Sequence, residues 1–324
     1  MKEKTYDVVA MGELLVDFAQ CGQSAQGNSL FEACPGGAPC NVLSMLSRLG
    51  KKTAFIGKVG DDMFGRLLRG TITDLGIQDR GLITDGRYST TLAFVQNDAS
   101  GDRSFTFARK PGADMMLTAE ELDCGLIRDA KIFHFGTLSM THPGVRAATK
   151  RAVAVARDAG ALISFDPNLR PPLWDSLEDA REQMAWGCGQ CDILKISEEE
   201  AVFLTGAASP QEAADLLRRD YPGIRLLLIT WGRGGSEAFY KDFHVMMATY
   251  LQVKTVDTTG AGDTFCGCCL GVVLDSGLED LDGLALGEML DMANAGASLV
   301  TTKKGAIRSM PTRGEIEALR KKGR

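Results

Sequence analysis

The chain contains the run Val256-Asp257-Thr258-Thr259-Gly260-Ala261-Gly262-Asp263-Thr264-Phe265, a polar, glycine-bearing turn that leads into an apolar segment. Apolar residues recur at helical spacing over 264–276, so the turn is expected to form a helix N-terminus. Gly260, Ala261 and Gly262 carry little or no side chain, so their amides can approach a ligand closely. The helix end adds roughly half a positive charge. The run therefore predicts an anion site that suits a phosphate.

Asp263 stands in this turn, where its carboxylate competes with a phosphate for the same amides. An ordinary N-cap or first-turn acid is one interpretation, because Asp is common there. Capping does not require the three small residues that precede it, however, and the combination indicates a catalytic base. Gly267 and Gly271 follow within the helix, where each costs about 1 kcal/mol relative to Ala. We therefore expect this helix to pack closely against the sheet.

Strands alternate with helical patterns over most of the chain. The predicted strands cover residues 7–11, 53–56, 131–135, 162–166, 193–196 and 226–230, and the chain from there to Val256 also has strand character. The alternation favours an α/β fold, with a mostly parallel sheet covered by helices on both faces. Two stretches break the rhythm, at about 15–33 and 88–109, and the second is expected to be a β-hairpin that turns at 97–102. Residues 1–324 are expected to form a single domain with these stretches inserted.

Composition excludes several classes of protein. The 324 residues are 44% hydrophobic and 24% charged, with a formal net charge of −6, so the chain can bury a large core and has no basic excess for nucleic acid. The longest apolar run, 266–274, is far shorter than the roughly 18 residues of a membrane span. The N-terminus lacks the pattern of a signal segment. Nine cysteines, an odd number, favour reduced thiols. These features predict a cytoplasmic protein that binds neither nucleic acid nor membrane.

The Gly260 turn resembles the second signature of the ribokinase-like (PfkB) carbohydrate kinases, Asp-Thr-x-Gly-Ala-Gly-Asp. A first signature is similar as well, in Gly36-Gly37-Ala38-Pro39-Cys40-Asn41 and in the later run 54–65. The similarity extends from about Tyr6 to Met310, and within the family it is greatest to fructokinases, through 107–114, 165–170 and 195–200. It implies a ribokinase-like fold in which 15–33 and 88–109 build a small β lid over the sugar. In this family the lid often serves as a homodimer surface.

The resemblance implies an ATP-dependent fructokinase that phosphorylates the primary 6-hydroxyl of D-fructose, with Asp263 as general base and Mg²⁺ at the phosphates. Positioning and electrostatic stabilisation would supply most of the catalysis. Another sugar or sugar acid, such as ribose or 2-keto-3-deoxygluconate, is an alternative substrate. A catalytically silent sugar or nucleotide sensor is an alternative from another class, and the retained Asp263 with its Gly-Ala-Gly argues against it.

Polar residues near predicted strand ends supply the expected sugar site, because open α/β sheets bind ligands at that edge. Asp17 would accept hydrogen bonds from two sugar hydroxyls, or it is a solvated lid charge. Asn41 would contact hydroxyls, or it caps a helix. Arg170 precedes two prolines that keep it out of helical conformation, so we expect a rigid cation that neutralises the transferring phosphate, with a surface ion pair as the alternative. Arg109 could contact phosphate or sugar, or form a surface salt bridge.

The predicted sites group by ligand. The expected catalytic residues are Gly260, Ala261, Gly262, Asp263 and Arg170. The expected substrate-binding residues are Asp17, Gly36, Gly37, Asn41, Arg109 and Asn168. The resemblance implies adenosine contacts from Thr230, Gly232 and Asn294. Near Mg²⁺ and the phosphates, relatives usually have Asn-x-x-Glu, whereas this chain has Ser197-x-x-Glu200. With no Walker loop or Rossmann fingerprint in the sequence, ATP must use the Gly260 turn. A site for a monovalent cation, expected to be K⁺, is implied at Asp257, Thr259, Gly305 and Ser309.

Overall fold

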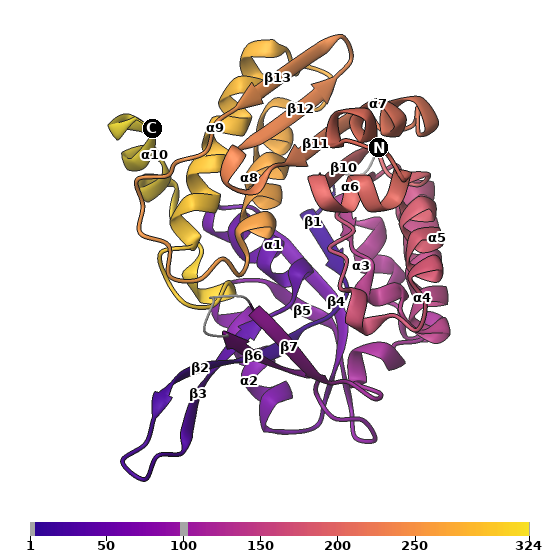
Figure 1. Ribbon diagram of the computed structural model, residues 1–324. Helices are drawn as coiled ribbons and strands as arrows, with labels where there is room; N and C mark the ends of the chain where they lie inside the picture. The colour runs from indigo at the N-terminus through magenta and orange to yellow at the C-terminus, as the bar shows by residue number, and fades with distance from the viewer. Residues whose placement is uncertain (1–3, 98–102, 324) are drawn as a thin grey trace.

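The computed structural model of the protein describes residues 4–97 and 103–323, and most of these belong to one large sheet and the helices around it (Figure 1). The sheet has nine strands in the order β13-β12-β11-β10-β9-β8-β1-β4-β5. The strands are β1 (Tyr6–Met11), β4 (Thr53–Gly60), β5 (Gln78–Asp85), β8 (Ala130–Phe135), β9 (Leu162–Phe165), β10 (Ile193–Ser197), β11 (Leu226–Thr230), β12 (Ser236–Tyr240) and β13 (Phe243–Met247). Only β12 and β13 run antiparallel to their neighbours, so the predicted mostly parallel sheet is confirmed.

Helices cover both faces of this sheet, as predicted. One face carries α1 (Ala38–Arg48), α2 (Met63–Asp74), α8 (Ala261–Ser276), α9 (Gly283–Val300) and α10 (Arg313–Lys322). The other carries α3 (Cys124–Arg128), α4 (Pro143–Asp158), α5 (Leu177–Cys188), α6 (Glu198–Thr205) and α7 (Pro210–Asp220). Strand β1 lies between the two cores: Val8 and Ala10 face one, and Val9 and Met11 face the other. This alternation is the period-2 pattern of a strand buried on both sides.

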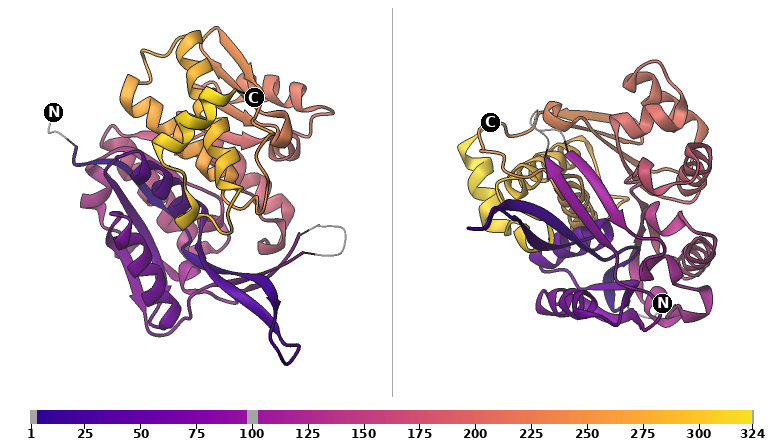
Figure 2. Two further views of the ribbon diagram at one scale, coloured as in Figure 1. Left: turned by 90° about the vertical axis from the view of Figure 1, so that its left-hand side faces the viewer. Right: turned by 60° about the horizontal axis from the view of Figure 1, so that its bottom comes forward.

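A second, four-stranded sheet forms the lid, which projects from one end of the body (Figure 2). Its strands are β2 (Leu15–Gln23), β3 (Ser29–Gly36), β6 (Leu92–Asn97) and β7 (Arg103–Ala108), in the order β3-β2-β6-β7. These strands lie in the two stretches that break the strand–helix rhythm, and the first stretch extends to Gly36 rather than ending at 33. Most of the predicted hairpin turn, 98–102, lies outside the described residues.

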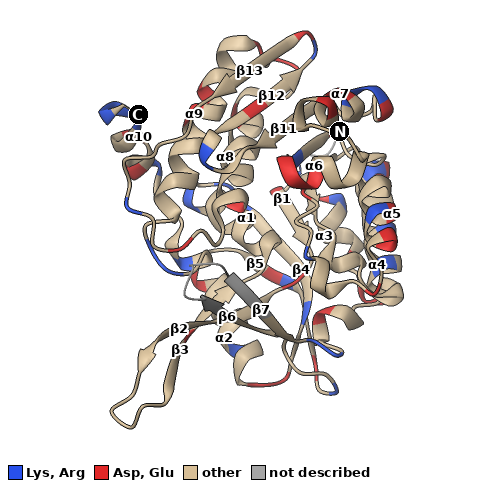
Figure 3. Ribbon diagram, in the orientation of Figure 1, with Lys and Arg blue, Asp and Glu red and all other residues tan. Residues whose placement is uncertain are grey.

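Aromatic side chains anchor the lid to the body. The ring of Phe18 stacks on Phe94 at 5.2 Å and meets the ring of Phe64, on α2, edge-on at 5.6 Å. The outer part of the lid is the arm formed by β2 and β3. Residues 18–31 of this arm include no Lys, Arg, Asp or Glu (Figure 3). The arm is therefore uncharged over most of its length.

Helix α8 packs closely on α1. A Cβ built on Gly267 would lie 2.8 Å from the Cβ of Met45, and one on Gly271 would lie 2.8 Å from Cδ1 of Leu49. The close packing was predicted, but its partner was wrong: these glycines face a helix and not the sheet. The helix also begins at Ala261, about one turn earlier than 264. In the part of the chain that the structure describes, no helix has the length and apolarity needed to cross a membrane.

Candidate active site

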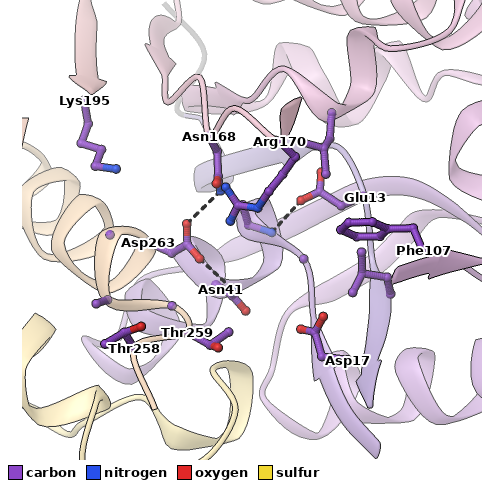
Figure 4. Close-up of a pocket in the computed structure, with 17 residues that line it drawn as sticks. Glu13, Asp17, Asn41, Phe107, Asn168, Arg170, Lys195, Thr258, Thr259 and Asp263 are labelled. Carbon is purple, nitrogen blue, oxygen red and sulfur yellow. Dashed lines mark hydrogen bonds between the residues drawn. The ribbon is translucent and has the colours of Figure 1, made fainter. Parts of the chain in front are cut away.

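Two cavities lie beyond the carboxyl ends of the parallel strands and meet at the first turn of α8. The lid-side cavity, of about 420 Å³, lies between the lid and α8 (Figure 4). The strand-side cavity, of about 380 Å³, lies beyond β10 and β11. Both are lined by Asn168, Arg170, Lys195, Ala261 and Gly262. The predicted anion site is thus the boundary between two adjacent cavities.

The first turn of α8 has the properties of an anion site. Gly260 adopts φ 78°, and a Cβ there would lie 2.5 Å from the Cβ of Ala306, so both conformation and space require glycine. Among the described residues no side chain caps this helix, and the residues of its first turn, Ala261, Gly262 and Asp263, line the lid-side cavity. Ala261 N donates to the carbonyl of Thr258 at 3.3 Å, and the amides that follow it lie at the positive end of a 16-residue helix, which favours a phosphate.

Asp263 follows Gly262 in this turn and lines the lid-side cavity, and its carboxylate accepts hydrogen bonds from two side chains. Its Oδ2 accepts a hydrogen bond from Nδ2 of Asn41 at 2.7 Å, and Oδ1 accepts one from Nδ2 of Asn168 at 3.4 Å. Burial, with Asp166 nearby, raises the pKa of Asp263 to about 6, against the opposing effect of Asn41, Lys195 and Arg170. The carboxylate is therefore mostly ionised at neutral pH and is able to accept a proton.

The loop after β9 supplies Asn168 and Arg170. Asn168 has φ 46°, a left-handed conformation that is uncommon outside glycine and is often found at functional sites. Arg170 extends into the lid-side cavity, and in the described chain the one recorded hydrogen bond of its guanidinium goes to the carbonyl of Leu169. Leu169 N in turn donates to Oε1 of Glu200 at 2.6 Å. Glu200 therefore fixes the loop that presents the cation.

Ser197 and Glu200 form the N-terminal capping box of α6. Ser197 Oγ accepts from the amide of Glu200 at 3.2 Å, and Glu200 Oε2 accepts from the amide of Ser197 at 3.0 Å. Both line the strand-side cavity. A serine caps a helix as well as an asparagine does, which explains locally why Ser197 can replace the family Asn.

The carboxyl groups of the lid-side cavity are held in a buried environment. Burial raises the pKa of Asp17 to about 7, although Arg170 opposes the shift. Gly36 lies beside Asp17, where a Cβ would collide with its carboxylate, and Gly37 lines the cavity. Glu13 also lines the cavity and was missed: its Oε1 accepts from Ala38 N at 2.8 Å, and burial raises its pKa to about 7. It follows β1 by two residues, so the strand-edge argument could have found it.

Arg109 is buried, so the expectation that it forms a surface salt bridge is wrong. Its side chain is 2% exposed and lies 2.7 Å from Oδ2 of Asp114. It also donates to Thr141 Oγ1 at 2.9 Å and to the carbonyl of Leu138 at 3.0 Å. Arg109 lines neither cavity and supports Leu138, which does line the lid-side one. Its contact with sugar or phosphate stays a prediction.

The predicted adenosine residues come together in the strand-side cavity. Thr230, Gly232 and Asn294 all line it. The polar side chain of Asn294, expected to need a partner within an apolar helix, donates to the carbonyls of Met247 at 3.1 Å and Ala248 at 3.4 Å. These bonds tie α9 to the last residue of β13 and to the residue after it.

The predicted cation residues link the loop before α8 to the loop after α9. Asp257 Oδ1 accepts from Thr259 N at 2.8 Å, and Oδ2 accepts from Gly305 N at 3.0 Å. All three line a cavity of about 230 Å³ under the lid. Ser309 does not line it and donates to the carbonyl of Lys304 at 2.7 Å. Among the described residues, no group of three or more His, Cys, Asp or Glu side chains is arranged to hold a metal.

Lys195 is a second residue that sequence reasoning missed. It lies in β10 with apolar neighbours, and its Nζ is 3.1 Å from Oδ2 of Asp166. Burial alone would lower its pKa, but Asp166, Glu200 and Asp263 raise it above the usual value. Lys195 therefore keeps its charge. The signal was present in the sequence, because a charged residue inside an otherwise apolar central strand requires a buried partner.

Comparisons with known proteins agree with this geometry. Fructokinase-1 of Zea mays is 44% identical over 311 residues, 95% of this chain and 96% of the maize protein. The structure of a fructokinase with bound ATP from Xylella fastidiosa has a TM-score of 0.88 and 30% identity, covering 98% of this chain and 99% of that chain. The structure of a double mutant of fructokinase from Vibrio cholerae O395, in fructose, ADP and potassium ion bound form, has a TM-score of 0.86 and 30% identity. The match covers 98% of this chain and 99% of that chain.

These likenesses span nearly the whole chain and confirm the ribokinase-like fold inferred from the two signatures. The model of the "pfkB family carbohydrate kinase" matches residues 5–313, which include the Gly260 turn, Asp263 and both cavities. The chain therefore belongs to the pfkB family of carbohydrate kinases.

Proposed function

We propose that this enzyme transfers the γ-phosphoryl group of ATP to the primary 6-hydroxyl of D-fructose. The observation that carries the proposal is Asp263, a buried carboxylate that lines the lid-side cavity in the first turn of the helix at which the two cavities meet. Fructose occupies the lid-side cavity and ATP the strand-side cavity. The maize relative is named a fructokinase, and the Vibrio cholerae structure contains fructose and ADP, which supports this choice of substrates.

Asp263 accepts the proton of the 6-hydroxyl while the hydroxyl oxygen attacks the γ-phosphorus in line. The bond to the bridging oxygen breaks, and ADP leaves with the electron pair. The amides at Gly260–Asp263 and the guanidinium of Arg170 hold the negative charge on the phosphoryl oxygens. Asn41 fixes Asp263, and Glu200 fixes the loop that carries Arg170. Because both are held before the sugar binds, the site needs little reorganisation.

Asp17 orients the sugar by accepting hydrogen bonds from two of its hydroxyls. Within the described chain no protein donor is recorded on this carboxylate, so its lone pairs are available to a ligand, and burial strengthens the bonds that it makes. Gly37 adds close backbone contact, and Asn168 contacts the sugar from the opposite wall. Asn41 donates a hydrogen bond to Asp263 and, like Asp263, lines the lid-side cavity.

The nucleotide lies with its adenosine at Thr230, Gly232 and Asn294 and its phosphates toward α8. When bound, Mg²⁺ would neutralise charge on the phosphate oxygens. Glu200 fits such a role, because it lines this cavity and offers carboxylate oxygens, the ligand type that Mg²⁺ prefers. Ser197 supports Glu200 through the capping box.

K⁺ is the proposed activating cation, between the loops that carry Asp257, Thr259 and Gly305. These residues line one small cavity behind the anion site and supply carboxylate, hydroxyl and carbonyl oxygens. Ser309 keeps the second loop in shape. The potassium ion in the Vibrio cholerae structure supports the choice of cation.

The proposal also covers assembly and location. A homodimer forms through the lid, whose arm has no charged residue over 18–31 and exposes Leu30 and Phe31. Residues 1–324 act as a single domain with this lid inserted. The enzyme works in the cytoplasm, a reducing compartment that suits its nine free cysteines.

A coupled ADP-release assay with ATP and Mg²⁺ tests the function across a panel of free sugars. D-Fructose is expected to give the highest kcat/KM, with fructose 6-phosphate as the product by NMR. A higher kcat/KM for ribose or 2-keto-3-deoxygluconate would reassign the substrate. Tight ATP binding by calorimetry, with no turnover on any sugar, would instead identify a silent sensor.

A further inference from the structure

Lys195 has no part in the mechanism described above, although it lies at the centre of the site. Its side chain is 8% exposed and borders both cavities beside α8. Figure 4 shows its ammonium pointing from β10 toward the Asn168 and Asp263 side of the cavity. A fixed positive charge thus stands at the boundary of the two cavities.

Two distances define the position of this ammonium. Nζ lies 3.1 Å from Oδ2 of Asp166, which holds it from behind. A Cβ built on Gly262 would lie 2.9 Å from Nζ, so the ammonium rests against the backbone of the anion site itself. Any side chain at Gly262 would displace it. Gly262 is therefore small for a second reason, besides giving a ligand access to its amide.

Another buried lysine, Lys58, shows how a purely structural ammonium is satisfied. Its Nζ lies 2.6 Å from Glu121 Oε1, 2.9 Å from the carbonyl of Met116 and 3.4 Å from Asp85 Oδ2. An ammonium has three donors, and Lys58 has an acceptor for each. Lys195 has one recorded partner in the described residues, Asp166, and borders open space. A buried charge with unused donors is costly unless a ligand completes its coordination.

We propose that Lys195 is a catalytic residue that donates hydrogen bonds to the γ-phosphoryl group during its transfer, and that Asp166 is the positioning residue that aims its ammonium. This rests on the proposed kinase reaction but not on the identity of the sugar. In the step, the acceptor oxygen bonds to phosphorus, the bond to the bridging oxygen breaks with its electron pair leaving on ADP, and the proton goes to Asp263. Lys195 keeps its proton and offsets the charge on the phosphoryl oxygens.

Steady-state kinetics of two matched variants test the proposal. Lys195→Met is expected to lower kcat by about 10²- to 10³-fold, the usual effect of losing one donor to a developing charge. Lys58→Met is the control, since it removes a buried lysine of equal size away from both cavities. It is expected to lower the melting temperature but to leave kcat per folded enzyme unchanged. A Lys195→Met enzyme whose folded fraction keeps kcat within about threefold would overturn the proposal.

Nucleotide binding separates this inference from the choice of sugar. By calorimetry without sugar, Lys195→Met is expected to weaken a non-hydrolysable ATP analogue about tenfold and ADP less than threefold, because only the analogue carries a γ-phosphoryl group. If the wild-type enzyme proves inactive on fructose but this difference appears, the substrate assignment fails and the role of Lys195 stands. Equal weakening of both nucleotides would reject it.

Conservative variants keep the test decisive if Lys195→Met does not fold. Lys195→Arg retains the positive charge and is expected to keep part of the kcat that Lys195→Met loses. Asp166→Asn keeps the lysine but removes the carboxylate that positions its ammonium. Asp166→Asn should therefore reduce kcat with little change in the KM for sugar. Full activity in Asp166→Asn would contradict the assigned roles. So would a folded Lys195→Arg enzyme whose affinities for ADP and for the ATP analogue fall equally.

Discussion

The lid-side and strand-side cavities share a wall but use their polar groups differently. On the lid side, Asp17 has no recorded protein donor in the described chain, and Asp263 is held only by side-chain amides. On the strand side, Glu200 and Asn294 are already bonded to backbone groups that shape the cavity. The difference teaches that side chains free to meet a ligand gather on the lid side and at the boundary. Substitutions should therefore separate by cavity.

The largest effect is expected at the boundary itself. Asp263→Asn removes the base but keeps the shape of the side chain, so kcat should fall by about 10²- to 10⁴-fold while folding and ATP binding stay nearly intact. Steady-state kinetics and calorimetry measure the two effects. Asp282→Asn, which replaces the N-cap of α9 by another good cap, is the matched control for an ordinary helix-end acid. Near-normal turnover of Asp263→Asn would contradict the mechanism.

Arg170 lines both cavities, and its substitution should affect turnover more than the affinity of either substrate. We expect kcat at saturating ATP and fructose to fall in the order Arg, Lys, Met, with about 10²-fold between the ends of the series. Lys keeps the charge but loses the planar fork, so its recovery is partial. If Arg170 were a surface ion-pair partner, each change would cost at most about 1 kcal/mol of stability and leave kcat alone.

Asp17→Ala should affect the lid side alone. Loss of hydrogen bonds to a charged acceptor, at about 1.5–3 kcal/mol, predicts a 10- to 100-fold rise in the KM for sugar, with the KM for ATP within about threefold. Glu32→Ala, which removes an exposed carboxylate of the same arm, is the control. Equal weakening of sugar and ATP binding in calorimetry would show that the two cavities are not separate in this respect.

A change in pH should affect sugar turnover more than nucleotide binding, although by less than the substitutions above. The pKa values of Asp17 and Asp263 are raised to about 7 and about 6, and both act as carboxylates. Activity is therefore lost as pH falls, and kcat/KM for sugar should decrease about tenfold from pH 8 to pH 6. The observed midpoint belongs to the coupled groups and not to one residue. ADP affinity over the same range is the comparison, and it should change much less.

The smallest expected effect comes from the cation loops. Replacing a bulky organic cation by K⁺ at equal ionic strength should raise kcat a few-fold, because a bound cation would add positive charge behind the anion site. The effect should appear mainly in kcat and not in the KM for sugar. Flat rates across such a titration would remove the cation from the proposed mechanism.

The core of the fold follows from local sequence signals. Buried parallel strands such as β10 and β11 are short apolar runs, and periodicity alone found them. Strand β5 was missed because Gln78–Asp85 mixes charged residues with few apolar ones, and its place at the sheet edge allows this. The two stretches of the lid were found because they break the strand–helix rhythm, and the family resemblance supplied their expected role over the sugar.

The site was predicted as a set of residues but not as a network. Strand ends and signatures placed Asn41 and Asp263 at the same edge, yet their 2.7 Å contact joins residues 222 positions apart. Similarly, the hydrogen bond from Leu169 N to Glu200 and the burial of Arg109 depend on how loops fold over one another. Such partners are set by tertiary packing, which one sequence without comparison does not encode in any short pattern.

The shared wall of the two cavities makes the enzyme a natural target for a bisubstrate ligand. Asn168, Arg170, Lys195, Ala261 and Gly262 line both cavities, so under the proposed function the sugar and the nucleotide would bind side by side. A single molecule that joins a fructose-like group to adenosine through a phosphate chain would bring its second half to the site at a high effective concentration. It would also require both cavities at once, and so would discriminate against proteins that recognise only ATP.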